Sequence, residues 1–213
     1  MRPNKTYIIA EIGPNHNGSI KLATKYIKLL ARSGANAVKF QLSEPEKALS
    51  KDSFPAKYEK NSKGFKKNLD IFETVKKRQL TKKNHEKLFK ICKKYKIDYL
   101  CSAFDIESLK FLNEKLSIRY FKIPSGEILS LDMLEYINKQ RKKVILSTGM
   151  ASFKEIAFCL SKLKMIRNKI VLLHCVSNYP TRNQDVNLLI MNKLKSKFKC
   201  QIGFSDHTLS ELA

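Results

Sequence analysis

The chain has 213 residues, 43% of them hydrophobic, and carries 42 lysines and arginines against 19 aspartates and glutamates. This length suits one sizeable domain, and no apolar run approaches the roughly 18 residues that a membrane span needs. The formal charge of +23 could indicate nucleic-acid binding, but 35 of the 42 basic residues are lysines, spread along predicted helices. Since base readout favours arginine, we expect lysine-rich solvated faces that steer an anionic small substrate, and no nucleic acid or membrane partner.

The N-terminus and the cysteines both indicate a cytoplasmic protein. The apolar stretch before Glu11 has four residues, YIIA, which is too short for the apolar core of a signal peptide. The five cysteines form no C-x-x-C pair and lie at apolar positions, which is typical of reduced, mostly buried thiols. We therefore expect a cytoplasmic localisation.

Apolar runs and amphipathic stretches alternate along the chain. The run at 6–13 precedes a helical pattern that begins after Ser19, and the run at 37–41 precedes a polar segment at 43–70. That segment is too long for an ordinary connection, so it is a candidate active-site loop or mobile segment. Five further runs predict strands at 98–104, 120–124, 143–149, 170–175 and 200–206. Between them, helices are predicted from Thr81, near 106–115, from Ser130, from Ser152 and near 186–198.

This alternation predicts an α/β fold in which helices cover both faces of a parallel sheet. An open doubly wound sheet and a closed barrel both fit it. No glycine-rich nucleotide-binding motif follows any strand, and polar residues collect where the strands end. Because only a barrel brings all strand ends to one rim, we predict an incomplete (β/α)8 TIM barrel of about seven strands, with the eighth missing.

The predicted rim carries two lysines and several hydroxyls. A single lysine at a strand end more often extends to solvent than binds a ligand. Here Lys39 and Lys122 occur with four hydroxyls, those of Ser102, Ser125, Ser147 and Ser205. Lysine offers a point charge to phosphate and each hydroxyl can donate a hydrogen bond, so the set predicts a site for phosphate and carboxylate.

Glu11 and the histidines allow more than one interpretation. An ionised Glu11 inside an apolar run needs a partner, so it either pairs with a barrel lysine or is catalytic. His174, within an apolar strand, is expected to be a core histidine, and His85 is assigned to a polar helix face without special function. The function of His16 is left open. His207 follows a strand end and is a candidate metal ligand, although one histidine cannot hold a metal alone.

Seven motifs together resemble the sialic acid synthase family, which comprises N-acetylneuraminate synthases and their legionaminate and pseudaminate relatives. They are IAEIGPNHNG, AVKFQ, SAFD, KIPSGE, ILSTGM, LLHCVSNYPT and GFSDHT, in this order from residue 9 to residue 208. The match spans nearly the whole chain. KIPSGE and HCVSNYP are more similar to the neuraminate and legionaminate branches than to the pseudaminate branch.

The resemblance implies a barrel enzyme that condenses phosphoenolpyruvate with an N-acetylated aminohexose, either N-acetylmannosamine or a 2,4-diacetamido-trideoxyhexose. The products would be a nine-carbon sialic-type acid and phosphate. It also implies a divalent metal, Mn or Mg, and a homodimer in which a C-terminal antifreeze-like domain covers the partner's site. The implied catalytic residues are Glu11, Lys39 and Lys122, and the implied metal ligand is His207. The implied substrate-binding residues are Gln41, Ser102, Phe104, Ser125, Ser147, Ser177, Tyr179 and Ser205.

The sequence also departs from the family pattern. Family members continue after SDHT into a strand whose H-F motif supplies the second metal-binding histidine, and then into the antifreeze-like domain. We therefore expect residues 1–213 to be a single barrel domain truncated at its C-terminal end, with the second histidine missing. Alone, the chain is expected to be nearly inactive and poorly stable, because the first and seventh strands would expose unpaired edges. Where family members more usually have T-P-F, this sequence has SAFD, so Ser102 stands where relatives often have threonine.

Two other functions fit parts of the sequence. A Schiff-base aldolase could use Lys122, since lysines on barrel strands can form imines with carbonyl substrates. A non-catalytic protein could bind nucleic acid through its positive charge, and its binding would depend steeply on salt.

Overall fold

The structure of the chain is a computed structural model that describes residues 6–50 and 70–209. The described residues fall into two compact units, the first ending at Arg119 and the second beginning at Tyr120. Most of the polar segment predicted as a candidate active-site loop, at 51–69, lies outside the described residues.

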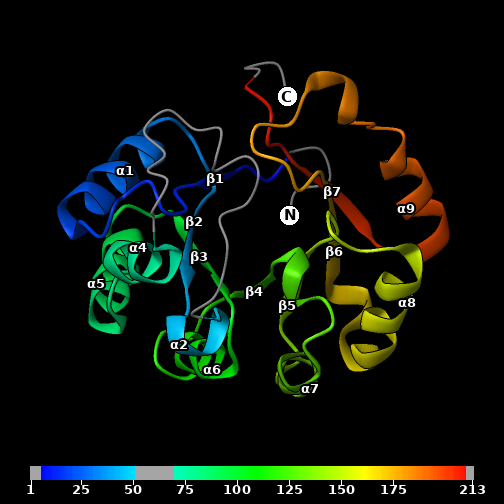
Figure 1. The fold of residues 1–213 in the computed structure, drawn as a ribbon, viewed down its shortest axis with the longest axis horizontal. Helices are drawn as coiled ribbons and strands as arrows, with labels where there is room; N and C mark the ends of the chain where they lie inside the picture. The colour runs from blue at the N-terminus through cyan, green and yellow to red at the C-terminus, as the bar shows by residue number, and fades with distance from the viewer. Residues whose placement is uncertain (1–5, 51–69, 210–213) are drawn as a thin grey trace. The chain divides into compact units, whose positions relative to one another are not determined.

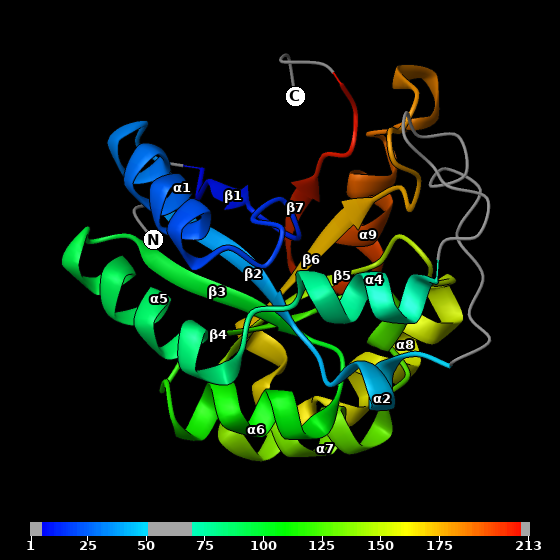
Figure 2. The ribbon, with the colours of Figure 1, turned by 60° about the vertical axis from the view of Figure 1, so that its left-hand side comes forward.

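The first unit combines three parallel strands with helices, as shown on the left of Figure 1. The strands are β1 (Ile9–Glu11), β2 (Ala37–Leu42) and β3 (Asp98–Ala103). The helices are α1 (Ile20–Arg32), α2 (Pro45–Ala48), α4 (Ile71–Arg78), α5 (Lys82–Lys94) and α6 (Ile106–Glu114). Helices α1 and α5 lie side by side along β2 and β3, as Figure 2 shows.

Side-chain caps explain where these helices begin. The hydroxyl of Ser19 accepts a hydrogen bond from the Leu22 amide at the start of α1, and Thr81 caps α5 in the same way. Such caps satisfy amide groups that have no partner within the helix. Both helix starts were predicted from the sequence and are confirmed.

The second unit contains four parallel strands, β4 (Tyr120–Ile123), β5 (Lys143–Ser147), β6 (Ile170–Cys175) and β7 (Gln201–Ser205). Its helices are α7 (Leu131–Gln140), α8 (Phe153–Lys162) and α9 (Ile190–Phe198), and α8 and α9 lie beside β6 and β7 in Figure 1. Three 3-10 helices connect these elements, η1 (Ser125–Glu127), η2 (Lys164–Lys169) and η3 (Asn183–Asp185). A capping box between Ser152 and Glu155 begins α8 at the position that the sequence predicted.

Strand register places the polar residues of each unit at the carboxyl ends of neighbouring strands. In the first unit, Glu11 is level with Lys39, and Gln41 is level with Ser102. In the second, Ser205 is level with Cys175 at the end of β6. The remaining strand residues are mostly apolar and buried, which provides each unit with a core that holds these ends in place.

The predicted α/β class is confirmed, because parallel strands alternate with helices in both units. All seven predicted strands are present, and β6 has the predicted bounds. No eighth strand occurs in residues 6–50 and 70–209. Helix α9 begins four residues later than predicted, since Asn187 has a φ of +48°, which a right-handed helix cannot include. No helix in the described part of the chain is long and apolar enough to cross a membrane. The five cysteines are free thiols, as expected, and four are buried.

Candidate active site

The first cluster of predicted site residues lies at the ends of β1, β2 and β3. The ammonium group of Lys39 is 2.9 Å from a carboxylate oxygen of Glu11 and donates a hydrogen bond of 3.0 Å to the hydroxyl of Ser102. The Gln41 amide approaches the same carboxylate at 3.4 Å. The Lys39 side chain is 12% exposed and that of Glu11 is 46% exposed. The cluster is therefore a cation held between an acid and a hydroxyl, with the acid reaching solvent.

The loop after β1 passes close to this cluster. The amides of Ile12 and Gly13 both donate to the Lys39 carbonyl, at 2.9 Å and 3.2 Å. Gly13 has a φ of +49°, and a Cβ atom there would lie 2.9 Å from a carboxylate oxygen of Glu11. Glycine is needed here because a side chain would strain the backbone and displace the acid. Phe104 follows β3, and its amide donates to the Leu42 carbonyl.

The second cluster contains Lys122, on β4, and Ser147, at the end of β5. Lys122 is 5% exposed, and its ammonium group donates to the Ser147 hydroxyl at 2.7 Å and to the Ile123 carbonyl at 3.0 Å. Ser125 lies in η1, directly after the strand that carries Lys122. Glu127 occupies the same turn and accepts a hydrogen bond from Ser130. This bond is local, between residues three apart, and stabilises the turn.

The third cluster contains His207, Tyr179 and Ser205, and follows β6 and β7. The rings of His207 and Tyr179 stack with centroids 4.2 Å apart. The His207 Nδ1 atom is 2.6 Å from the Val176 carbonyl oxygen, and its Nε2 atom is 3.3 Å from the Ser205 hydroxyl. The backbone of His207 also accepts a hydrogen bond of 2.7 Å from the Thr181 amide. These contacts fix the imidazole against the loop after β6.

This arrangement determines which nitrogen of His207 is open to a ligand. A carbonyl oxygen only accepts hydrogen bonds, so in the neutral ring Nδ1 carries the proton and Nε2 presents its lone pair, towards the Ser205 hydroxyl. A metal-binding histidine commonly uses its second nitrogen in this way. Among the residues that the structure describes, however, no three histidine, cysteine or acidic side chains gather into a metal site. His207 thus fits a metal as one ligand, and the described residues do not complete a site.

Ser177 packs closely against the turn that follows β5. A Cβ atom on Gly149 would lie 2.7 Å from the Ser177 hydroxyl and 2.8 Å from the Cys175 sulfur. The STG turn and the segment that carries Ser177 can approach this closely only because Gly149 has no side chain.

The histidines outside these clusters are all buried. The Nε2 atom of His174 donates a hydrogen bond of 2.7 Å to the Val186 carbonyl oxygen, which confirms His174 as a core histidine with a satisfied partner. The assignment of His85 to a polar helix face is wrong, because the side chain is fully buried between α5 and the strands. Burial lowers the pKa of His85 to about 4 and also lowers the pKa of His16. His85 precedes Leu88 and Cys92 at helical spacing, which is the signal that would have identified its buried face.

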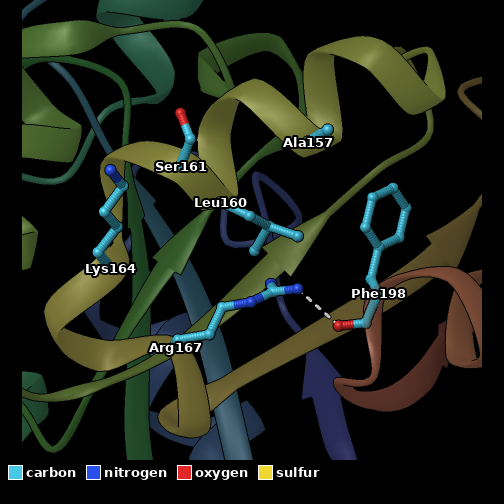
Figure 3. A pocket seen from close by; sticks show the side chains of 6 residues that line it. All are labelled: Ala157, Leu160, Ser161, Lys164, Arg167 and Phe198. Carbon is cyan, nitrogen blue, oxygen red and sulfur yellow. Dashed lines mark hydrogen bonds between the residues drawn. The ribbon is translucent and has the colours of Figure 1, made fainter.

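A surface cavity of about 350 Å³ lies elsewhere in the second unit (Figure 3). It is lined by Ala157, Leu160, Ser161, Lys164, Arg167 and Phe198. The Arg167 guanidinium points across it and donates to the Phe198 carbonyl at 2.6 Å, at the end of α9. Arginine at a helix C-terminus commonly satisfies a free carbonyl in this way, so the cavity has a structural explanation. None of the predicted site residues lines it.

The known proteins similar to this chain include several sugar acid synthases. The N,N'-diacetyllegionaminic acid synthase of Campylobacter jejuni is 44% identical over 208 residues, covering 96% of this chain and 61% of that protein. The pseudaminic acid synthase of Helicobacter pylori is 34% identical over 213 residues, covering 100% of this chain and 61% of that protein. The chain thus spans about three fifths of the length of these curated relatives.

Solved structures show the fold. The sialic acid synthetase from Leptospira borgpetersenii, in complex with citrate, has a TM-score of 0.82 at 34% identity, covering 96% of this chain and 66% of that one. A truncated 3-deoxy-D-arabino-heptulosonate 7-phosphate synthase from Thermotoga maritima has a TM-score of 0.64 at 15% identity. The match covers 96% of this chain and 66% of that one. These likenesses confirm the predicted TIM-barrel class, with seven of its strands described here. The NeuB family model matches residues 26–213, and the chain belongs to the NeuB family.

Proposed function

We propose that this chain supplies the barrel residues of an enzyme that condenses phosphoenolpyruvate with an N-acetylated aminohexose. The observation that carries the proposal is a lysine paired with a strand-end hydroxyl, found once in each unit: Lys39 with Ser102, and Lys122 with Ser147. Phosphoenolpyruvate carries a phosphate and a carboxylate. A lysine and a hydroxyl together provide the charge and the directed donor that such groups require.

In the proposed reaction, C3 of phosphoenolpyruvate bonds to the aldehyde carbon of the open-chain sugar, and the aldehyde oxygen takes up a proton to become a hydroxyl. Water then adds at C2 and loses a proton, and the bond between C2 and the phosphate oxygen breaks, which leaves a keto acid and inorganic phosphate. Lys39 in the first unit and Lys122 in the second are each proposed to neutralise an anionic group of phosphoenolpyruvate. The hydroxyls of Ser125 and Ser205 would donate further hydrogen bonds to its oxygens.

Glu11 is proposed to move a proton at a sugar hydroxyl or at the attacking water. Its carboxylate is fixed by Lys39 at 2.9 Å and remains 46% exposed, so it can contact a substrate while its position is maintained. A general acid or base must lie within hydrogen-bonding reach of the reacting group, which an exposed, anchored carboxylate allows. Gln41, Ser177 and Tyr179 are proposed to contact the sugar, and Phe104 to border the same substrate.

A divalent metal, Mn or Mg, is proposed as the cofactor, with the His207 Nε2 atom as one ligand. When bound, such an ion polarises a carbonyl oxygen as a Lewis acid. The stacked Tyr179 ring and the Val176 carbonyl fix the imidazole in one orientation, which supports the proposal.

A homodimer is proposed because apolar side chains are exposed on the segment between β6 and α9, which also carries Tyr179 of the third cluster. Tyr179, Leu188 and Leu189 are 47%, 54% and 72% exposed, and all three lie on the segment between β6 and α9. Exposed apolar groups gathered on one segment favour a covering protein surface. Sedimentation analysis of the chain and of a Leu188→Ser, Leu189→Ser variant tests this, and equal monomer content in both at high concentration would contradict it.

Binding of phosphoenolpyruvate, followed by 31P NMR and calorimetry, tests the main proposal. The chain should bind phosphoenolpyruvate, and Lys39→Met and Lys122→Met should each weaken binding strongly. Lys110→Met is the matched control, since Lys110 is an exposed lysine on α6. Calorimetric titration of N-acetylmannosamine and of a 2,4-diacetamido-trideoxyhexose onto the phosphoenolpyruvate-bound chain, which needs no turnover, then compares the two sugar classes. Equal binding by all three variants would overturn the proposal. Borohydride trapping of a keto acid on Lys122 would support the aldolase instead.

A further inference from the structure

The two faces of β2 carry different chemistry. Successive strand residues point to opposite faces, so Lys39 and Gln41 share one face and Phe40 occupies the other. Lys39 and Gln41 contact Glu11 at the site, whereas Phe40 is fully buried against residues of α5 and β3. Whatever holds Phe40 in place therefore also determines where its two neighbours point.

Phe40 is enclosed by one tyrosine and two histidines. Its ring stacks on Tyr99 with centroids 5.5 Å apart and planes at 23°, and it meets the edge of His85 at 6.2 Å and 89°. His16, from the loop after β1, lies 6.1 Å from the same ring. The Nδ1 atom of His16 accepts a hydrogen bond from the Gly18 amide, so this ring also shapes the loop beside Glu11.

A buried hydrogen bond fixes this enclosure. The Nδ1 atom of His85, on α5, is 2.5 Å from the hydroxyl of Tyr99, on β3. Both side chains are almost completely buried, at 0% and 4% exposure. Because a hydrogen bond has a preferred length and direction, this bond fixes the position of α5 relative to β3 more closely than an apolar contact would.

The same pair has a cost that an apolar pair would avoid. Within the described residues, the Nε2 atom of His85 is buried and has no hydrogen-bond partner. An unsatisfied buried polar atom destabilises the folded state, and replacing both partners with apolar groups of similar shape can be neutral or stabilising. A stability role alone therefore does not explain a histidine and a tyrosine at these positions.

We infer that His85 and Tyr99 are positioning residues: their hydrogen bond, acting through Phe40, sets the position of Lys39 against Glu11 and Ser102. The inference rests on the proposed function in one respect only, the identity of the molecule that Lys39 binds. It predicts that removing the polar pair preserves or raises stability and impairs the site, which is the opposite of what loss of a merely structural contact would do.

The test compares the wild-type chain with the double variant His85→Leu, Tyr99→Phe. Three quantities are measured: the denaturant midpoint of unfolding, the affinity for phosphoenolpyruvate, and the rate at which Lys39 is acetylated by limiting acetic anhydride, read by mass spectrometry. Lys110 in the same digest is the internal control. We expect an equal or higher midpoint, affinity lower on the order of tenfold, and faster acetylation of Lys39 with Lys110 unchanged.

Unchanged acetylation of Lys39 in the folded double variant would overturn the inference, whatever the midpoint. If the double variant does not fold, Tyr99→Phe alone is judged by the same measurements. Acetylation needs no substrate, so it separates the two hypotheses. A wild-type chain that does not bind phosphoenolpyruvate contradicts the proposed function, while the change in Lys39 reactivity still decides the positioning role.

Discussion

The Nδ1 atom of His207 lies 2.6 Å from the carbonyl oxygen of Val176. Because the carbonyl can only accept, this contact leaves the Nε2 atom of His207 unprotonated when the ring is neutral. His174 shows the opposite arrangement, with its Nε2 atom 2.7 Å from the Val186 carbonyl. The two histidines of the second unit should therefore be opposite tautomers.

Nitrogen-15 NMR of the histidine rings at mildly alkaline pH checks this prediction. His207 should show a protonated Nδ1 and His174 a protonated Nε2, with each ring assigned by its loss in a His→Gln variant. Added Mn²⁺ should broaden the ring signals of His207 before those of His174. The same tautomer at both residues would contradict the hydrogen bonds described here, and prior broadening of His174 would argue against His207 as a ligand.

The two lysine-bound hydroxyls provide a second prediction. Ser102→Ala and Ser147→Ala should each weaken phosphoenolpyruvate binding roughly tenfold, because each removes a hydrogen bond to a charged group. Ser161→Ala is the control, since its hydroxyl donates to the Phe158 carbonyl within its own helix. Calorimetry at constant ionic strength measures the three affinities. Binding that falls equally in all three variants, or in none, would not support the assignment of these hydroxyls.

Local signals explain why the strands and helix starts could be predicted. Ser19, Thr81 and Ser152 act as caps through contacts within three residues, and such contacts are readable from sequence. Glu11 was expected either to pair with a barrel lysine or to be catalytic, and the ion pair with Lys39 is present.

Contacts between distant segments could not be predicted in the same way. The Lys122 contact with Ser147 depends on the pairing of β4 with β5, which sequence spacing does not specify. For His85 the two local signals disagree, because a polar residue type favours a solvent-facing position whereas its helical spacing to Leu88 favours the buried face that the structure has. The face of a helix that packs is decided by its tertiary partners, here β3 and α1.

Gly149 provides a third prediction, on stability. Gly149→Ala would place a methyl group 2.7 Å from the Ser177 hydroxyl and 2.8 Å from the Cys175 sulfur, with the Cys175 carbonyl at 3.0 Å. Because backbone as well as side chains must move, the free energy of unfolding should fall by about 1–3 kcal/mol. At Gly126, in η1, a Cβ atom would meet nothing within 4 Å, so Gly126→Ala is the matched control. Denaturant unfolding of both variants measures this free energy. An unchanged midpoint for Gly149→Ala would contradict the close packing of Gly149 against Ser177 and Cys175.

The buried histidines of the first unit provide a prediction about acid stability. Burial lowers the pKa of His85 from 6.5 to about 4, so the unfolded chain takes up a proton on His85 before the folded chain does. Above pH 6.5 His85 is neutral in both states and does not lower the free energy of unfolding. As the pH falls from about 6.5 to about 4, the free energy of unfolding should decline by at most about 3 kcal/mol because of His85. His16, whose pKa burial also lowers, acts in the same direction.

The other ionisable groups of this cluster do not contribute in that range. Burial raises the pKa values of the Cys92 and Cys101 thiols to about 12 and holds that of Tyr99 well above its usual value, so all three stay neutral. The free energy of unfolding, measured against pH, should therefore decline less steeply between pH 6.5 and 4 in His85→Leu, Tyr99→Phe than in the wild type. The part that remains in the variant reflects His16 and, towards the acidic end of this range, carboxylates such as Glu44, whose pKa is lowered by hydrogen bonds from Lys82 and Lys47. Identical slopes for the variant and the wild type would show that His85 accepts its proton equally well in both states, contrary to its burial.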